Sequence, residues 1–324
     1  VFITENAALE PPVLFMAGHS RSAEDGSYSL TLPPGDYEVQ VNAEGHEFAD
    51  PDPALATIAS GATTSLDFDL PQPGFLEVSV SARPLVGVAG PLPAKLQVVG
   101  FDPSPNLQNN VLGSSTGVFG DNSDNLAYGI TLVHFIDRSG MSPRLTLEPG
   151  DYQVVVSRGP RYSAYRQNIT IAPGQTTSID ADIVQVLDTS GYVYGDFHVH
   201  SIQSPDAEVN LQERVATYLA EGVDFFTPSD HDIRVDFTPT IAAMDVADLV
   251  GTASSGEITT FDYGHMNSWP VTVDPNRIGG GTVDWGRAAP PGQDFPEYAS
   301  YVLSPAEIYA ATLAAPLGHI VQIT

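Results

Sequence analysis

The pattern of apolar and polar residues changes its character near residue 190. Before that point, apolar residues mostly alternate with polar ones, and Pro-Gly turns separate the alternating segments. A period of two predicts strands with one buried face. After Gly191, strand-like and helix-like patterns follow one another. The sequence therefore predicts a β-rich part followed by an α/β part.

The β-rich part contains an internal repeat. The segment LTLPPGDYEVQV begins at Leu30 and LTLEPGDYQVVV begins at Leu145, 115 residues later. Likewise, GATTSLD begins at Gly61 and GQTTSID begins at Gly174, 113 residues later. Two such similar offsets indicate a duplicated module. We predict one small antiparallel sandwich in residues 1–72 and a second in residues 73–188, with a surface-loop insertion at residues 106–125.

Within each copy, the Pro-Gly segment is predicted to be the turn of a β-hairpin between two alternating strands. The LPPGDYEV motif resembles the carboxypeptidase regulatory-like β-sandwich module. The resemblance implies a scaffold without chemistry of its own.

A βαβ unit is predicted from Gly195 to Asp232. The run FHVH that begins at Phe197 alternates, so both imidazoles should lie on one face of a strand. Asn210 and a glutamate three residues later have the spacing of a capping box, and Gly222 suits the end of the helix. An apolar strand then ends in the sequence PSDHD.

Three further features follow. Residues 274–303 are rich in Gly and Pro and are predicted to be a long loop. A serine N-cap at Ser304 followed by proline starts a helix that should run to about Ala315. A buried strand is expected to begin at His319.

Candidate chemistry is concentrated after residue 195. Imidazoles and carboxylates together are the usual ligands of zinc, manganese or iron. Glu257 can bridge two metals, and three aspartates are placed to accept the second N–H of ligand histidines. The candidate ligands are His198, His200, Asp206, His231, Glu257 and His265, and the supporting aspartates are Asp196, Asp230 and Asp232.

The same residues also have interpretations without a metal ion. An H-x-H pair in a strand is often incidental, and an Asp-His-Asp cluster can belong to a turn. Ser201 and Ser204 lie near the histidines, but no serine nucleophile elbow surrounds them. The remaining histidines are predicted to be ordinary structural or surface residues; they are His19, His46, His134 and His319.

The motifs GDFHVHS, TPSDHD, SGEITT and GHMN together resemble the PHP (polymerase and histidinol phosphatase) metallohydrolases, in particular the carbaryl-hydrolase-like branch. The resemblance spans residues 190–270. It implies a distorted α/β barrel with two or three metal ions, ligated by the residues above. It also implies a later ligand histidine and an Asp-x-His segment that the sequence lacks, so the barrel in residues 189–324 is expected to be truncated.

The amino-acid composition excludes some classes of binding partner. The formal net charge is −28 with a single lysine, Lys95, which disfavours nucleic acids and anionic membranes. There is no cysteine, so disulfides and thiolate ligands are excluded. No apolar run is long enough to span a bilayer. The composition suits a secreted or periplasmic protein of a prokaryote, and the oligomeric state is not indicated.

The function expected from the sequence is a metal-dependent hydrolase. Metal ions would activate a water molecule for attack on an ester, amide or carbamate bond of a small-molecule substrate. A phosphoesterase is the alternative chemistry. The alternative of another class is a non-catalytic surface or adhesion protein with a vestigial barrel, which the duplicated β modules favour.

Overall fold

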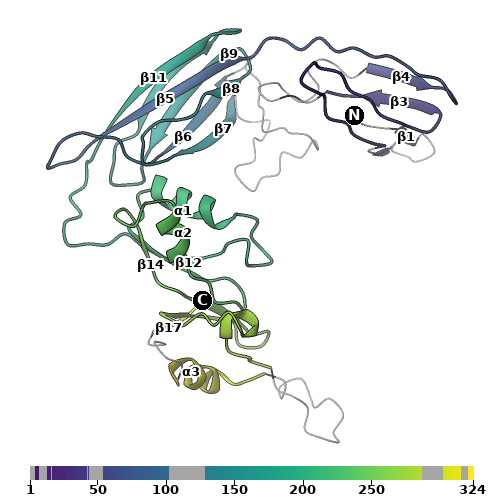
Figure 1. Cartoon of the computed structure of the whole chain (residues 1–324). Coiled ribbons are helices and arrows are strands. Elements are labelled where there is room, and N and C mark those ends of the chain that lie inside the picture. Colours follow the sequence, from purple (N-terminus) through teal and green to yellow (C-terminus); the bar gives the residue numbers. More distant parts are fainter. Residues whose placement is uncertain are drawn as a thin grey trace, which may run out of the picture.

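The computed structural model describes residues 4–6, 13–15, 17–41, 43, 54–101, 128–286, 302–314 and 320–324. Strands dominate these residues, and helices are few and short. Figure 1 shows the central β-sandwich above, with helices α1 and α2 beneath it and the repeat's first copy to one side. No helix in the described residues is long and apolar enough to cross a membrane.

The N-terminal half consists of strands. They are β1 (Thr4–Asn6), β2 (Val13–Phe15), β3 (Gly35–Val39), β4 (Ala54–Ile58), β5 (Gly74–Arg83), β6 (Ala94–Phe101), β7 (Tyr128–Ile136), β8 (Leu145–Leu147), β9 (Gly150–Ser157), β10 (Tyr165–Ile171) and β11 (Thr176–Val184). The C-terminal part mixes strands and helices. These are β12 (Gly195–Val199), α1 (Leu211–Ala220), β13 (Phe225–Pro228), α2 (Thr238–Ala243), β14 (Gly251–Thr252), β15 (Gly256–Thr259), β16 (His265–Trp269), the 3-10 turn η1 (Ile278–Gly281), α3 (Pro305–Ala314) and β17 (Ile320–Ile323).

The central sandwich is formed by residues 74–184. One sheet has the strand order β10-β9-β6-β7 and the other has the order β11-β5-β8. Their facing sides bury a continuous apolar core. It includes Leu76, Leu96, Tyr152 and Ile183, each of which is 0% exposed. The alternation seen in the sequence thus places every second residue of β5 and β9 in the core.

The hairpin predicted at the Pro-Gly turn is wrong. Strand β8 pairs with β5, whereas β9 pairs with β6 and β10, so the turn carries the chain from one sheet to the other. In the first copy, β3 pairs with β4. The alternating residues 26–32 before the turn form no strand, so the predicted hairpin is missing there as well. Alternation predicts which face is buried, but it does not select the neighbouring strand.

The duplication is nevertheless visible in the contacts. In both copies, the tyrosine after the turn donates a hydrogen bond to a carbonyl four residues earlier, and the preceding aspartate accepts one from a threonine on the next strand. The tyrosine bonds are Tyr37 to Pro33 (2.8 Å) and Tyr152 to Glu148 (2.7 Å), and the threonine bonds are Thr57 to Asp36 and Thr170 to Asp151 (both 2.6 Å). Residues at equivalent positions therefore make the same hydrogen bonds in both copies.

Replacing Tyr152 by Phe should lower the free energy of unfolding by about 1 kcal/mol, because the carbonyl of Glu148 loses a donor while the ring stays in place. Tyr192→Phe is the control, since Tyr192 is 80% exposed. Urea unfolding followed by circular dichroism measures both variants. Equal stability of the two would contradict the role assigned to this hydroxyl.

The α/β part begins as predicted. Strands β12 and β13 are parallel neighbours joined by α1, and β13 and β14 are joined by α2. The capping prediction is confirmed, because Asn210 accepts from the backbone N–H of Glu213 at 2.9 Å and its amide reaches the Glu213 carboxylate at 3.0 Å. Gly222 follows the helix with a φ of 69°, the left-handed conformation that glycine adopts most easily. The predicted helix start at Ser304 is also confirmed by α3.

The expected fold class, two sandwich modules and an α/β barrel, is wrong. The described residues are mostly β, and their small sheets form no closed barrel. Only five residues separate β15 from β16, too few for the crossover that a parallel strand needs. Strand β16 therefore returns antiparallel, and β15, β16 and β17 form a separate sheet. The expected domain boundaries at residues 72 and 188 stay predictions.

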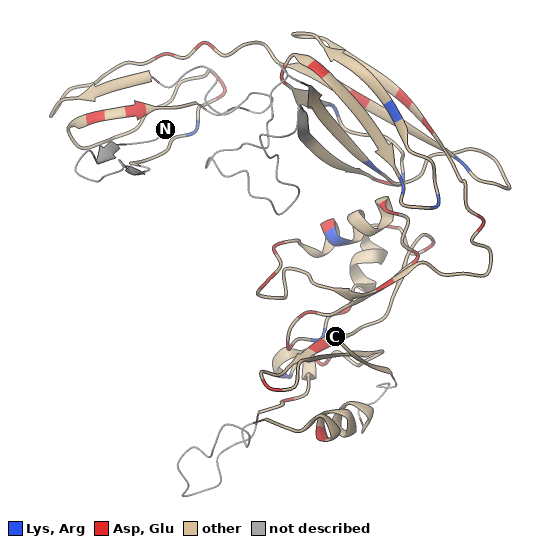
Figure 2. Cartoon of the chain, turned by 180° about the vertical axis from the view of Figure 1, so that it is seen from behind, with Lys and Arg blue, Asp and Glu red and all other residues tan. Residues whose placement is uncertain are grey.

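Four basic side chains join the sandwich to the α/β part. Figure 2 shows basic residues where the lower edge of the sandwich faces the helices. The pairs are Lys95 with Glu221, Arg138 with Asp248 (3.2 Å), Arg161 with Asp224 (2.8 Å) and Arg158 with the carbonyl of Leu219 (2.6 Å). A chain with only 12 basic residues thus uses a third of them at this interface.

This interface also orients the first strand of the α/β part. The carboxylate of Asp224, held by Arg161, accepts a hydrogen bond from the backbone N–H of Tyr194 at 2.9 Å, directly before β12. Arg158 is 6% exposed, and burial lowers the pKa of its guanidinium, although the group stays charged at neutral pH. The sandwich therefore helps to fix the strand that carries His198.

Candidate metal centre

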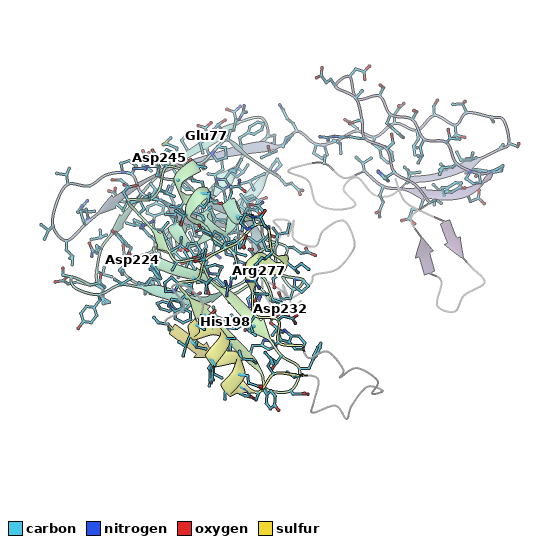
Figure 3. The ribbon with its side chains drawn as sticks, turned by 60° about the horizontal axis from the view of Figure 1, so that its bottom comes forward. Glu77, His198, Asp224, Asp232, Asp245 and Arg277 are labelled. Atoms are coloured by element: carbon cyan, nitrogen blue, oxygen red, sulfur yellow. The ribbon has the colours of Figure 1, made fainter. Side chains whose placement is uncertain are left out.

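The candidate ligands come from four separate segments that meet at one edge of the α/β part. His198 lies in β12, and His200 follows that strand directly. His231 follows β13, whose parallel pairing with β12 brings the two carboxyl ends together. His198, labelled in Figure 3, lies in the same part of the molecule as Asp232.

The third and fourth segments, β15 and β16, bring Glu257 and His265 to the same place. Residues Asp230 to Asp232 run beside β15, with the N–H of Asp232 donating to the carbonyl of Glu257 at 2.7 Å. Because β16 is antiparallel to β15, its first residue His265 lies opposite Thr259, at the strand end that faces the other histidines. His265 thus reaches the cluster from the start of its strand, whereas the other histidines lie at or after the ends of theirs.

Glu257 is the centre of the cluster. Its side chain is 0% exposed, and four imidazoles surround the carboxylate. The nitrogen-to-oxygen distances are 2.9 Å for His231, 3.3 Å for His265, 3.6 Å for His200 and 3.7 Å for His198. The Oε1 atom accepts a hydrogen bond from Thr324 at 2.8 Å. The Oε2 atom is buried and, although it lies 2.9 Å from Nδ1 of His231, it accepts no hydrogen bond of suitable geometry. A buried carboxylate oxygen left in this way is costly unless a cation satisfies it.

The two histidines of the H-x-H motif confirm the prediction that they share a face. Their rings stack with centroids 5.0 Å apart, and their Nε2 atoms are 3.0 Å apart. Two imidazole nitrogens bound to one tetrahedral zinc ion at about 2.05 Å would lie about 3.3 Å apart. The observed spacing therefore fits shared ligation of one ion.

Asp206 completes a second ligand group. Its carboxylate lies 3.1 Å from Nδ1 of His200 and 3.2 Å from Nε2 of His231. A hydrogen bond from Ser204, and then the nearby imidazoles, lower the pKa of Asp206 to about 2. The carboxylate is ionised at neutral pH, as a metal ligand must be.

The residues fit divalent metal ions of the borderline type. Three groups have donor atoms within 4.8 Å of one another: His198, His200 and Glu257; His200, Asp206 and His231; and His231, Glu257 and His265. The groups share members, so a bridging arrangement around Glu257 is geometrically available. The structure thus brings together all six candidate ligands.

The three supporting aspartates make other contacts. Asp196 accepts from the backbone of His198 and from the hydroxyl of Tyr218, and burial raises the pKa of that tyrosine. Asp230 accepts from Ser201 at 2.7 and 2.8 Å, and burial raises the pKa of its carboxyl group. Asp232 accepts from the indole of Trp285 at 2.9 Å. None of these contacts is to an imidazole, so the aspartates shape the loops around the ligands.

Hydroxyl groups take the place expected for the aspartates. Ser204 lies 3.1 Å from Nδ1 of His200, and Thr259 lies 2.7 Å from Nδ1 of His231. The sequence could have predicted the role of Thr259, because this residue stands two positions after Glu257 and therefore lies on the same face of β15. Of the other histidines, His134 is half-buried in the sandwich and His19 is exposed, while His46 and His319 lie outside the described residues.

Comparisons with known proteins give a different picture from the motifs. No protein-family model and no curated protein matches the chain. Among solved structures, the GBS52 minor pilin of Streptococcus agalactiae has 16% identity over 52% of this chain and 68% of its own, with a TM-score of 0.23. The group B streptococcus pilus 2b backbone protein has 12% identity over 48% and 52%, with a TM-score of 0.21. The Bacillus anthracis TIE protein has 12% identity over 60% and 31%, with a TM-score of 0.23.

These findings correct the family and the activity expected from the sequence. No PHP metallohydrolase model matches the chain, and the small sheets of the described residues form no closed barrel. The expectation of a metallohydrolase is therefore corrected, because the α/β barrel that would have housed the reaction is not formed by these residues, and a small-molecule substrate has no support. The short histidine motifs resemble those of that family, but the described residues do not form its barrel.

Proposed function

We propose that this chain is a non-catalytic, extracytoplasmic surface protein in which divalent metal ions hold the α/β part together. The observation that carries the proposal is Glu257, a wholly buried carboxylate surrounded by imidazoles from three other segments. A metal ion here would neutralise the buried charge and would link β12, the loop after β13 and the β15–β16 pair. Zinc, manganese and iron all suit this donor set.

The remainder of the chain supports a surface role. Tandem β modules are scaffolds, and here the second of them is joined to the α/β part by four basic side chains. The strongly acidic composition keeps such a surface soluble and away from anionic membranes. The metal centre would then stabilise the α/β part that the sandwich carries.

Metal content tests the proposal. The purified chain, incubated with zinc, manganese or iron and then desalted, should retain one to three ions per molecule by elemental mass spectrometry. The double variant His198→Ala/His200→Ala should retain fewer, because both residues belong to candidate ligand groups. The matched control is His134→Ala in the sandwich, which should retain as much metal as the parent. A parent chain that retains no ion would contradict the metal centre.

The non-catalytic half of the proposal has its own test. The metal-loaded chain should hydrolyse aryl esters and aryl phosphates no faster than the Glu257→Gln variant does. Turnover by the parent that is lost in that variant would contradict a purely structural role of the metal.

A further inference from the structure

Two buried oxygen atoms close to Glu257 have no hydrogen-bond partner among the described residues. They are Oδ1 of Asn267 and Oγ of Ser255, and both residues are 0% exposed. Burying a polar atom in this way is unfavourable, because bulk water can no longer satisfy it. Two such atoms beside a candidate metal centre therefore indicate a polar group that both of them bind.

Both residues lie on the face of the sheet that carries Glu257. Asn267 of β16 is directly opposite Glu257 of β15, and the Cβ atoms of such a pair lie about 4.5–5.5 Å apart. Ser255 stands two positions before Glu257 in the same extended segment, so its side chain points to the same side. The Nδ2 atom of Asn267 donates to the carbonyl of Phe197 at 3.2 Å. The amide therefore reaches from β16 to β12, the strand that carries His198.

The candidate ligands leave coordination positions open. Each of the three ligand groups consists of two imidazoles and one carboxylate, and so supplies three donor atoms. Four-coordinate zinc needs one ligand more, whereas six-coordinate manganese or iron needs three more. On the outer side solvent can fill these positions, because the side chains of His198 and His265 are 43% and 38% exposed. On the inner side, beside the buried Glu257, a water molecule needs acceptors within the protein.

We propose, on the basis of the metal centre proposed above, that Asn267 and Ser255 hold water molecules in the coordination shell of the metal ions. A cation polarises its water ligands and makes them strong hydrogen-bond donors, and the amide oxygen of Asn267 can only accept. Additional water ligands suit a six-coordinate ion but not four-coordinate zinc. The two side chains thus shift the preference of the centre from zinc towards manganese or iron.

Metal affinity and metal hydration test the role of the two side chains. The probes are Mn²⁺ and Zn²⁺ alone, with dissociation constants measured by competition with a chelator. The water ligands of bound Mn²⁺ are counted by electron spin-echo spectroscopy in D₂O. Asn267→Leu keeps the size of the side chain and removes its oxygen. This variant should bind Mn²⁺ about tenfold more weakly, should lose less affinity for Zn²⁺, and should retain fewer water ligands.

Ser255→Ala separates the hydration of the metal from folding. Because the hydroxyl has no partner among the described residues, the metal-free variant should unfold at the same urea concentration as the parent or a higher one. It should nevertheless lose Mn²⁺ affinity and water ligands, as Asn267→Leu does. Thr252→Val is the matched control, since the hydroxyl of Thr252 is also buried without a described partner. Thr252 lies opposite Phe226, in the core that packs on α1, so this variant should bind both metals as the parent does.

The outcomes distinguish this role from the metal centre itself. If the parent binds metal and both Asn267→Leu and Ser255→Ala keep its ratio of dissociation constants, the role of the two residues is overturned and the metal centre stands. More water ligands in Asn267→Leu would make the amide oxygen a direct ligand, which also overturns the proposal. A parent that binds neither metal would overturn the metal centre and this role together.

Discussion

Replacing Glu257 by Gln should leave the metal-free protein at least as stable as the parent. In the presence of metal, the same variant should be less stable than the parent. In the metal-free chain, no metal cation offsets the desolvation of the buried carboxylate. The neutral amide has the same shape, so the variant should be at least as stable as the parent. With metal at a hundredfold excess over the dissociation constant, the parent should gain about 2.7 kcal/mol. The variant should gain clearly less, because two of the three ligand groups include Glu257.

The chain provides its own reporter for this measurement. Both of its tryptophans, Trp269 and Trp285, lie in the α/β part, and Trp269 stacks on Phe197 next to His198. Urea unfolding followed by tryptophan fluorescence therefore reports on the metal centre. Glu208→Gln is the matched control, because Glu208 is exposed in the loop between the histidines and α1. A parent that gains no stability from metal, or a variant that gains as much, would contradict the assigned role of Glu257.

Replacing Gly159 by Ala should destabilise the protein by about 2–5 kcal/mol and uncouple its two parts. Gly159 has a φ of 59°, which costs other residues about 1–2 kcal/mol. A Cβ atom there would lie 2.1 Å from the carbonyl oxygen of Glu221, across the interface with α1. Relieving that overlap would cost about another 1–3 kcal/mol and would separate Arg158 and Arg161 from their partners.

Gly191→Ala separates these two effects. Gly191 has a φ of 82°, but an added Cβ atom would meet nothing within 4 Å. This variant should therefore show the backbone strain alone. In Gly159→Ala, the tryptophan transition should also come at a lower urea concentration than the far-ultraviolet transition of the sandwich, whereas the two should coincide in Gly191→Ala. Equal losses and coincident transitions in both variants would contradict the close approach of the sandwich to α1.

Local features of the sequence predicted local structure well. Asn210 and Glu213 form the expected cap, Gly222 ends the helix, and the alternation in FHVH puts both imidazoles on one side. Each of these depends on residues within a few positions of one another. The internal repeat could also be recognised in the sequence, and the equivalent tyrosine hydrogen bonds of the two copies give its physical basis.

The global fold could not be predicted from the sequence in the same way. The histidine motifs resemble a barrel family, but closure of a barrel depends on pairing between strands far apart in sequence. The five residues between β15 and β16 decide against a parallel continuation, and a short motif does not contain that information. In the repeat, likewise, the Pro-Gly turn predicted two adjacent strands, whereas β8 and β9 belong to different sheets.

The sequence by itself determined the duplicated module, the capped helix and the set of imidazole and carboxylate residues, because these follow from spacing along the chain. Only the tertiary structure decided that Glu257 lies buried among four imidazoles, and that hydroxyl groups of Ser204 and Thr259 support two of them. Burial and strand pairing are set by contacts between distant segments, and those contacts form only when the chain folds.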